Sequence, residues 1–290
     1  MASLIKRRIE LEVDTIAVNP ELRISGKATK TYKPEPNTCE VKVYGLSPEH
    51  RAQLTQVKTP LVKLAAGYGT GREGMTQLFY GKVLFVSHEV LPATGDIVTT
   101  LSTTDGGVKK QSSRVNINFG PKTKTSDVLR RIVQALGLNP GNSDKVGKLL
   151  DAGKSANLFV DGAVVSGSAA NELSHLLRSC GYEWSIQDET LQLRKIGAAA
   201  DGFAIELNPS TGLIGSPAIS NKGVLSGQCL LFKAGAGLDL VPGRLARVSS
   251  AFVSGQFILA KTDFDFDNYS DQWYCNFQAV TKKGDLPKIG

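Results

Sequence analysis

The densest group of glycines in the 290-residue sequence lies in the stretch AAGYGTGREG, which contains Gly67, Gly69, Gly71 and Gly74. Glycines can cradle the pyrophosphate of a dinucleotide when a strand precedes them and a helix follows. Gly69, Gly71 and Gly74 have the Gly-x-Gly-x-x-Gly spacing of a dinucleotide site, but the segment that follows, MTQLFYGKVLFVSHEV, is rich in β-forming residues and does not have a helical pattern. We therefore expect a hairpin connection in which the glycines supply positive φ, and no nucleotide site.

A second stretch, GKLLDAGKS, resembles a phosphate-binding P-loop. Gly153, Lys154 and Ser155 fit the end of that motif, but Gly147 lies one residue too early. The motif also needs a preceding strand, whereas the residues between the two glycines have a helical pattern. We expect Gly153 to end a helix.

The third candidate is the acidic stretch TDFDFDNYSDQW. Asp263, Asp265, Asp267 and Asp271 occupy the places of ligands 1, 3, 5 and 9 in a calcium-binding EF-hand loop. The glycine of position 6 and the bidentate glutamate of position 12 are missing, and strands rather than helices flank the stretch. The pattern favours the acidic tip of a hairpin, with a weak cation site as the alternative.

Other catalytic constellations are scarce. The three histidines, His50, His88 and His175, show no metal-ligand spacing, and no Gly-x-Ser-x-Gly motif is present. The four cysteines lie far apart in sequence without a Cys-x-x-Cys pair, which indicates reduced, mostly buried thiols and excludes a zinc ribbon; they are Cys39, Cys180, Cys229 and Cys275. A pair of glycosidase carboxylates needs only proximity in space and stays open. We assign no catalytic residue, no cofactor and no metal ligand.

Composition indicates an ordinary globular chain. Hydrophobic residues make up 41% and charged residues 21% of the sequence, and the net charge is +7. The basic residues are scattered without interleaved aromatic residues, which argues against specific nucleic-acid binding. The longest uncharged run, 207–221, contains two prolines and is shorter than the roughly 20 residues that a membrane helix needs. We expect a soluble protein without a signal peptide, made in a cytosol.

The elements that must position these residues follow a β, α/β, β order. Residues 1–107 alternate polar and apolar side chains between Gly and Pro punctuation, with one helix expected over Pro48–Gln56 after the N-cap Ser47. Residues 199–290 contain five further strand candidates, GFAIEL, VLSGQCLLF, GRLARVSS, GQFILAKTDF and WYCNFQAV. Short strands at this spacing favour barrels or sandwiches. No exact repeat is visible, although two β units of similar size suggest a duplicated barrel.

The middle region, 108–198, has a helical period. Apolar stripes predict helices over 126–136 and 168–180, with Ser126 and Ser168 as N-caps and glycines at their ends. A shorter helix is expected in SDKVGKLLDAG, and alternation predicts a hairpin over 182–194.

The C-terminal third carries a recognisable pattern. It comprises GLIGSP at 212–217, the pair Leu230-Leu231, the turn Pro242-Gly243 and the acidic turn before Trp273. LAAGYGTGREGMTQLFYGKV, the turn at 104–106 and AANELSHLLRSCGYEWSIQDETLQLRK extend the likeness over nearly the whole chain. In these motifs the sequence resembles the baseplate hub family of long-tailed, in particular contractile-tailed, bacteriophages.

This resemblance implies a fold and a structural role. The expected fold is mainly β with an α/β insertion: two tube-like antiparallel β-barrels, 1–107 and 199–290, linked by a helical and hairpin subdomain, 108–198. Three copies would place six barrels in a ring that adapts the six-fold tail tube to the three-fold central spike. The implied partners are further copies in a homotrimer, the spike, the tail tube or its initiator, the tape-measure protein and baseplate wedge proteins, all in the virion.

Two other classes stay open at this point. A tail-associated cell-wall hydrolase would lose activity on peptidoglycan after mutation of one carboxylate. A basic β-barrel that binds nucleic acid would show an affinity for DNA that falls steeply with salt.

Overall fold

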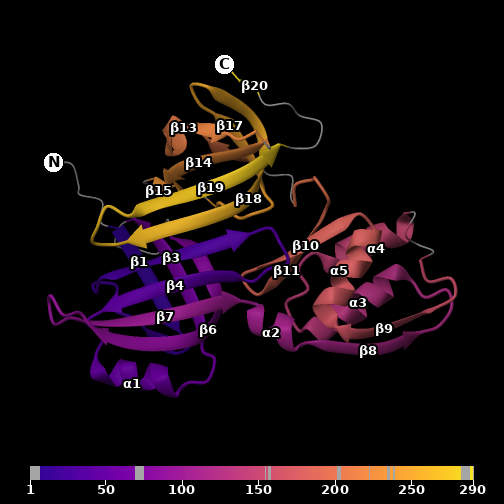
Figure 1. The fold of residues 1–290 in the computed structure, drawn as a ribbon, viewed down its shortest axis with the longest axis horizontal. Coiled ribbons are helices and arrows are strands. Elements are labelled where there is room, and N and C mark those ends of the chain that lie inside the picture. Colours follow the sequence, from indigo (N-terminus) through magenta and orange to yellow (C-terminus); the bar gives the residue numbers. More distant parts are fainter. Residues whose placement is uncertain are drawn as a thin grey trace. The chain divides into compact units, whose positions relative to one another are not determined.

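The computed structural model describes residues 7–68, 75–153, 155, 158–200, 204–221, 223–233, 236–237, 239–281 and 288–289. The chain divides into two compact units, named here the β unit and the middle unit (Figure 1). The β unit comprises Met1–Thr31, Asn37–Asp105 and Asp201–Gly290, and the middle unit comprises Tyr32–Pro36 and Gly106–Ala200. A mainly β chain with an α/β insertion is confirmed. The three-domain division at 107/108 and 198/199 stays a prediction.

The N-terminal half of the β unit follows the predicted alternation. Its elements are β1 (Arg7–Val13), β2 (Ile16–Ala17), β3 (Ile24–Thr31), β4 (Asn37–Tyr44), α1 (Pro48–Gln56), β5 (Leu61–Tyr68), β6 (Thr76–Val90) and β7 (Ile97–Asp105). Helix α1 has the predicted bounds because the Ser47 hydroxyl accepts a hydrogen bond from the His50 amide, at 3.2 Å.

The C-terminal half contains each of the five predicted strands. Its elements are β12 (Ala204–Leu207), the 3₁₀ turn η2 (Pro209–Thr211), β13 (Leu213–Ile219), β14 (Val224–Leu230), β15 (Phe232–Lys233), β16 (Ala236–Gly237), β17 (Leu245–Ser249), β18 (Val253–Asp267), β19 (Trp273–Thr281) and β20 (Lys288–Ile289). Strand β13 was not predicted because Gly215 and Pro217 interrupt its alternation.

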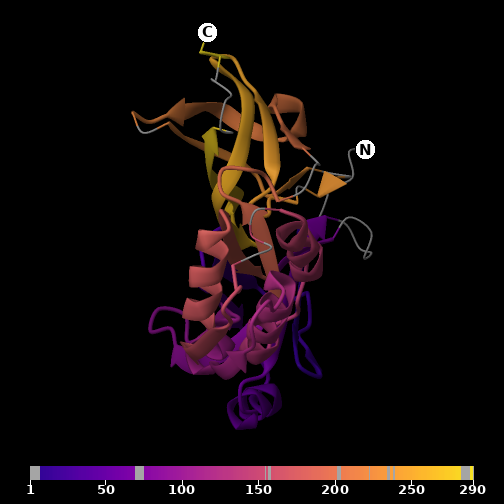
Figure 2. The ribbon, with the colours of Figure 1, turned by 90° about the vertical axis from the view of Figure 1, so that its right-hand side faces the viewer.

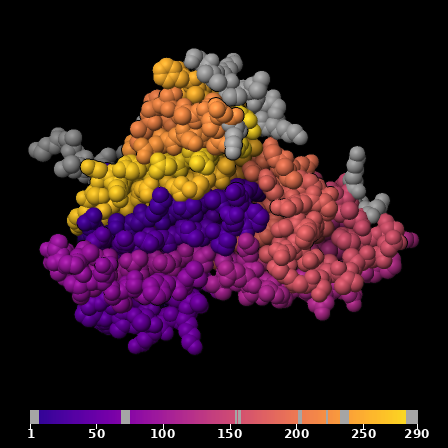
Figure 3. Space-filling view, viewed as in Figure 1, coloured from indigo at the N-terminus to yellow at the C-terminus, as the bar shows by residue number. Residues whose placement is uncertain are grey.

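One sheet contains strands of both halves. Its order is β13-β14-β19-β18-β3-β4-β7-β6-β5-β1-β2, with β17 and β20 on β18 and β12 on β17. The halves meet where β18 pairs with β3 in antiparallel register, from Lys261 opposite Thr31 to Asp267 opposite Ser25. In the space-filling view the yellow β18 region borders the indigo β3 region directly (Figure 3). We call this junction the seam.

The two halves repeat one strand order. In the N-terminal half the order is β3-β4-β7-β6-β5-β1, and in the C-terminal half it is β13-β14-β19-β18-β17-β12, with the strands in the same succession along the chain. Strands β6 and β18 both have 15 residues, and their hairpin partners β7 and β19 both have 9. One difference is that β12 runs parallel to β17, whereas β1 is antiparallel to β5.

The repeat extends to the register of individual residues. In the first hairpin Val83 lies opposite Thr103, and after a shift of register Phe85 lies opposite Ser102. In the second hairpin the same shift separates the pair Leu259–Ala279 from the pair Lys261–Gln278. Such a shift marks a β-bulge, which bends the bulged strand, and the long yellow strands are bent in the side view (Figure 2).

Among the described residues of the β unit, buried apolar side chains of both halves form one hydrophobic core. The predicted inward face of β19 is confirmed, because Trp273, Cys275 and Phe277 are buried while Tyr274 and Asn276 are only partly so. Burial of alternate residues fixes the register of each strand, since a slip by one residue would turn the apolar set outward.

The middle unit has a separate core. Its elements are α2 (Gly107–Ser112), β8 (Arg114–Phe119), α3 (Thr125–Leu136), α4 (Ser143–Ala152), β9 (Ala163–Ser168), α5 (Ala169–Ser179), β10 (Tyr182–Gln187) and β11 (Thr190–Lys195). The predicted helices and the hairpin of β10 and β11 are confirmed, whereas the pairing of β8 with β9 was not predicted. The apolar stripes of α3 and α5 contribute to one buried cluster with that hairpin.

Of the two predicted N-caps, Ser126 of α3 was wrong, whereas Ser168 is confirmed as the N-cap residue of α5. Helix α3 begins at Thr125, one residue earlier than Ser126. The backbone amide of Ser126 donates a hydrogen bond to the Asp151 carboxylate at 3.0 Å, so a side chain at the end of α4 caps the N-terminus of α3. Ser168 does precede α5, but its side chain makes no capping hydrogen bond. Within the described residues, no helix has the length and apolar character that crossing a membrane requires.

Candidate functional site

The acidic stretch that the sequence singled out lies at the seam. Asp263, Asp265 and Asp267 belong to β18, and their opposite residues on β3 are Thr29, Lys27 and Ser25. Phe264 and Phe266 point to the other face of the strand and are buried in the core. The stretch is therefore a strand with one apolar and one polar face, followed by a short turn into β19, as the sequence favoured.

Two of these carboxylates bind side chains across the strands. Asp263 accepts hydrogen bonds from the Thr29 hydroxyl and the Lys261 ammonium, both at 2.6 Å. Burial alone would raise the pKa of Asp263, but these donors lower it below its ordinary value. Asp265 accepts a hydrogen bond from the Asn276 amide at 3.0 Å and lies 3.7 Å from the Lys27 ammonium.

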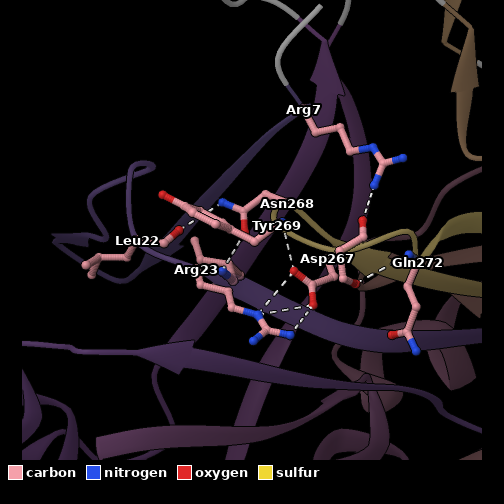
Figure 4. A network of polar contacts seen from close by, with 9 residues as sticks. Arg7, Leu22, Arg23, Asp267, Asn268, Tyr269 and Gln272 are labelled. Atoms are coloured by element: carbon pink, nitrogen blue, oxygen red, sulfur yellow. Dashed lines mark hydrogen bonds and ion pairs between the residues drawn. The ribbon is translucent and has the colours of Figure 1, made fainter. Parts of the chain in front are cut away.

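Asp267 ends the strand and is the most buried of the three (Figure 4). The Arg23 guanidinium donates to it through Nη2 at 2.7 Å and Nε at 3.2 Å, and the Tyr269 amide donates at 2.9 Å. Burial would raise the pKa of this carboxyl, yet the Arg23 hydrogen bonds and the Tyr269 amide hold it below its usual value. Asp267 thus remains charged at neutral pH.

The turn after Asp267 fastens the seam further. The Asn268 side chain accepts a hydrogen bond from the Ile24 amide and donates one to the Leu22 carbonyl, both at 2.8 Å. The Arg7 guanidinium donates to the Ser270 carbonyl in the same region (Figure 4). The turn of the C-terminal half is therefore held by two separate segments of the N-terminal half, Arg7 and Leu22–Ile24, which makes the seam a specific junction.

The arrangement does not resemble a cation site. The carboxylates of β18 are each engaged by a different nitrogen or hydroxyl donor, so they do not converge on one point. Across the described part of the chain, no group of three or more His, Cys, Asp or Glu side chains is placed to hold a metal ion. The geometry of these residues supports mechanical joining of two β segments.

The other sequence candidates lie apart from the seam. Gly67 lies in β5 opposite Arg8, and β5 and β6 form the predicted hairpin, whereas Gly69, Gly71 and Gly74 lie outside the described residues. Gly153 ends α4, as predicted, with its amide donating to the Leu150 carbonyl at 3.2 Å. Lys154 lies outside the described residues.

The histidines and cysteines do not assemble into a site. His50 is in α1, His88 bonds the Thr99 hydroxyl on the neighbouring strand at 3.0 Å, and His175 is on α5 in the middle unit. Cys39 is buried on β4, Cys180 is partly exposed at the end of α5, and Cys229 and Cys275 are buried opposite each other on β14 and β19. All four are free thiols, as predicted.

The polar partners of the aspartates in the seam were missed by sequence reasoning. Arg23, Lys27 and Thr29 lie more than two hundred residues before the aspartates they contact. A signal did exist, since Lys27 and Thr29 alternate with small residues in RISGKATKT as the aspartates alternate with phenylalanines. The alternation defines a polar face on each strand but does not identify which strands are neighbours.

Solved structures with this fold come from phage tails and related machines. The 43 kDa tail protein of prophage MuSo2 from Shewanella oneidensis is similar over 96% of this chain and 97% of its own, with a TM-score of 0.61 and 9% identity. A tail protein from Neisseria meningitidis MC58 is similar over 95% and 97%, with a TM-score of 0.60 and 10% identity. An E. coli type VI secretion system component, described as similar in structure to the T4 tail proteins gp27 and gp5, matches 97% of this chain and 79% of its own, with a TM-score of 0.53 and 10% identity.

These likenesses define the fold class as that of phage tail proteins. In this chain the fold consists of two β halves that are joined at the seam. The family described as Baseplate hub gp41 matches residues 4–279, and the chain belongs to that family. It is accordingly a structural component of a phage tail hub, as the sequence resemblance implied. No curated protein sequence matches the chain.

Proposed function

We propose that three copies of this chain form a ring at the centre of a tail baseplate, which adapts the six-fold tail tube to the three-fold central spike. One observation carries the proposal: the two halves of the β unit have the same strand order and the same bulged hairpin register. Two similar β halves in each of three chains supply six similar positions around one axis, as a six-fold neighbour requires, while the ring itself keeps three-fold symmetry.

The proposal assigns the chain contacts and no catalysis. Its partners are the two other copies, the spike, the tail tube or its initiator, the tape-measure protein and the wedge proteins. Assembly takes place in the host cytoplasm, before the particle is released. The four thiols are free, as expected for a protein completed in a reducing compartment.

Amine cross-linking of purified tail particles tests this function. Increasing doses of a lysine-reactive cross-linker should convert the chain into a ladder that ends at three copies, with spike or tube adducts appearing beyond it. A ladder that ends at six copies, or particles that lack the chain, would contradict the proposal. The isolated chain is expected to remain monomeric where ring closure needs a template, so the particle is the material to use.

A further inference from the structure

Strand β6 has a long unpaired edge. On one side it pairs with β7 from Lys82 to Val90, but on the other side β5 pairs only as far as Lys82. In the described part of the chain, no strand pairs with the segment Phe85–Val90 on that second side. An unpaired edge is a template for another strand unless it is covered.

The backbone groups of this edge can be assigned from the hairpin register. The Leu91 amide donates to the Asp96 carbonyl at 2.8 Å, so this pair is of the hydrogen-bonded type. Hydrogen-bonded pairs alternate along an antiparallel ladder, so residues 85, 87 and 89 direct their amides and carbonyls to β7. Val86, His88 and Val90 therefore direct theirs to the unpaired edge.

The side chains around this edge are unusually apolar for a surface. Leu84 is 58% exposed, Phe85 63% and Val90 60%. Helix α1 flanks the segment through a contact of 3.4 Å between Thr55 and His88, but His88 and the residues beyond it remain exposed. Exposed apolar side chains along a free strand edge are characteristic of an interaction surface.

The C-terminal half shows what occupies the equivalent edge. The bulge and register of the two hairpins match, so Phe85–Val90 of β6 corresponds to Lys261–Phe266 of β18. In β18 this segment pairs with β3, the strand at the start of the sheet order β3-β4-β7-β6-β5-β1 of the N-terminal half. The strand that corresponds to β3 in the C-terminal half is β13, which stands at the end of the sheet order.

We propose that β13 of one copy pairs with the free edge of β6 in the next copy, and so repeats the seam between molecules. This inference rests on the proposed trimeric hub and names the contact that closes it. Ala28 and Ile219 occupy equivalent places, since each lies two strands from the equivalent residues Thr103 and Ala279. Transferring the pairing of Phe264 with Ala28 puts His88 opposite Ile219, and Ser87 opposite Ser220.

The two kinds of seam differ in strength. Within the chain, the residue pairs Asp263–Thr29 and Asp265–Lys27 add polar contacts to the ladder. Between copies, the equivalent pairs are Ser87–Ser220 and Glu89–Ala218, which carry no opposite charges, and Pro217 in β13 has no amide to donate. The inter-copy seam is therefore the weaker one, so that rings close on a template while each chain folds alone.

Disulfide trapping in particles tests the register. Residues 262, 264 and 266 of β18 correspond to the residues of β6 that direct their backbone groups to the free edge, so they form the hydrogen-bonded pairs with β3. The pair Asp263–Thr29 is therefore of the non-hydrogen-bonded type, in which the two Cα atoms are about 4.5 Å apart. This separation is within the range of a disulfide, and the corresponding pair between copies is Ser87–Ser220. We would combine Ser87→Cys with Ser220→Cys in a Cys180→Ser background and oxidise purified particles with copper phenanthroline. The matched control combines Ser87→Cys with Ser226→Cys, which places the second thiol on the exposed side of β14, one strand away.

The expected result is a covalent species of three chains that dithiothreitol returns to monomers, with no such species from the control. The inference is overturned when the amine cross-linker yields trimers from the same particles but the Ser87→Cys, Ser220→Cys chain stays monomeric on oxidation. Absence of amine-linked trimers would instead refute the proposed hub function, so the two failures are distinct.

A backbone variant gives a second readout. His88→Pro removes an amide that points to the free edge, whereas His88→Ala removes the side-chain contacts and keeps the amide. Incorporation into particles should fall at least tenfold for His88→Pro relative to His88→Ala. Equal incorporation of the two variants would contradict the pairing. A thermal midpoint of the isolated His88→Pro chain below that of His88→Ala would mean that the proline destabilises the fold itself. In that case the disulfide experiment decides whether β13 pairs with β6.

Discussion

Replacing Asp267 by Asn probes the intramolecular seam with the least change in shape. The Asp267 side chain is 3% exposed and accepts two hydrogen bonds from the Arg23 guanidinium and one from the Tyr269 amide. Asparagine keeps an oxygen for the Tyr269 amide but replaces the charge with an amide group, whose own hydrogens then face those of Arg23. The matched control is Asp271→Asn, at an exposed position of the same turn.

The size of the expected stability loss follows from the burial of Asp267 and the exposure of its partner Arg23. A hydrogen bond between charged groups contributes about 1.5–3 kcal/mol, whereas an exposed ion pair contributes about 0–1 kcal/mol. The burial of Asp267 puts the pair in the range of charged hydrogen bonds, and the Arg23 side chain, which is 44% exposed, keeps the expected loss in the lower half of that range. We expect Asp267→Asn to lower the free energy of unfolding by about 2 kcal/mol, and Asp271→Asn by less than about 0.5 kcal/mol.

Tryptophan fluorescence can report the β unit separately. Trp273 lies in the β unit opposite Phe266 at the seam, and Trp184 lies in the middle unit. In a Trp184→Phe background, urea unfolding followed at Trp273 therefore reports the unit that contains the seam. The comparison requires equal m-values, so that a shift of the midpoint reflects stability.

The loss of stability caused by Asp267→Asn has a defined pH dependence. Because the folded state lowers the pKa of Asp267, its charge stabilises the protein above the pKa of the unfolded chain, and this contribution is lost as pH falls through the folded pKa. Wild type and Asp267→Asn should thus differ fully at pH 7 and converge in acid. A difference in the free energy of unfolding between wild type and Asp267→Asn of less than about 0.5 kcal/mol at pH 7 would refute the role given to this carboxylate. An equal loss of stability in Asp271→Asn would refute it as well.

Three further substitutions test other parts of the fold by urea unfolding followed by circular dichroism. Leu176→Asp buries an unpaired charge in the core of the middle unit and should cost about 3 kcal/mol; a loss under about 0.5 kcal/mol would mean that the stripe of α5 is exposed. Gly26→Ala places a Cβ 2.1 Å from the Glu40 carbonyl oxygen and should cost about 2 kcal/mol, while Gly120→Ala meets open space and should be neutral; equal effects would contradict the close packing at β3. Glu189→Gln removes the charge that pairs with Lys109 at 3.3 Å and should cost about 1 kcal/mol; an unchanged free energy of unfolding would contradict the role given to this ion pair.

Local patterns in the sequence predicted most elements because they record which side of an element is buried. Alternation at Trp273, Cys275 and Phe277 identified the inward face of β19, and the β-rich segment after Gly74 excluded a nucleotide-binding helix. Ser47 located α1 to the residue because capping is a local interaction. Ser126 failed as a cap because Asp151, from another helix, supplies the acceptor.

The seam and the repeat could not be predicted in the same way. Alternating polar residues at Lys27 and Asp265 define faces, but pairing between strands so far apart in sequence depends on the whole sheet. The repeat is hidden because equivalent residues differ in type. The pair Val43–Thr99 occupies the place of Cys229–Cys275, so the topology is conserved between the halves where the side chains are not.

A reconstruction of the tail baseplate tests the central claim most directly. The account predicts three copies of this chain around a central channel, with N-terminal and C-terminal β halves alternating in six similar positions. It also predicts that β13 of each copy lies beside β6 of the next. Six copies in the ring, a copy number not divisible by three, or only one of the two β halves facing the channel would contradict the account.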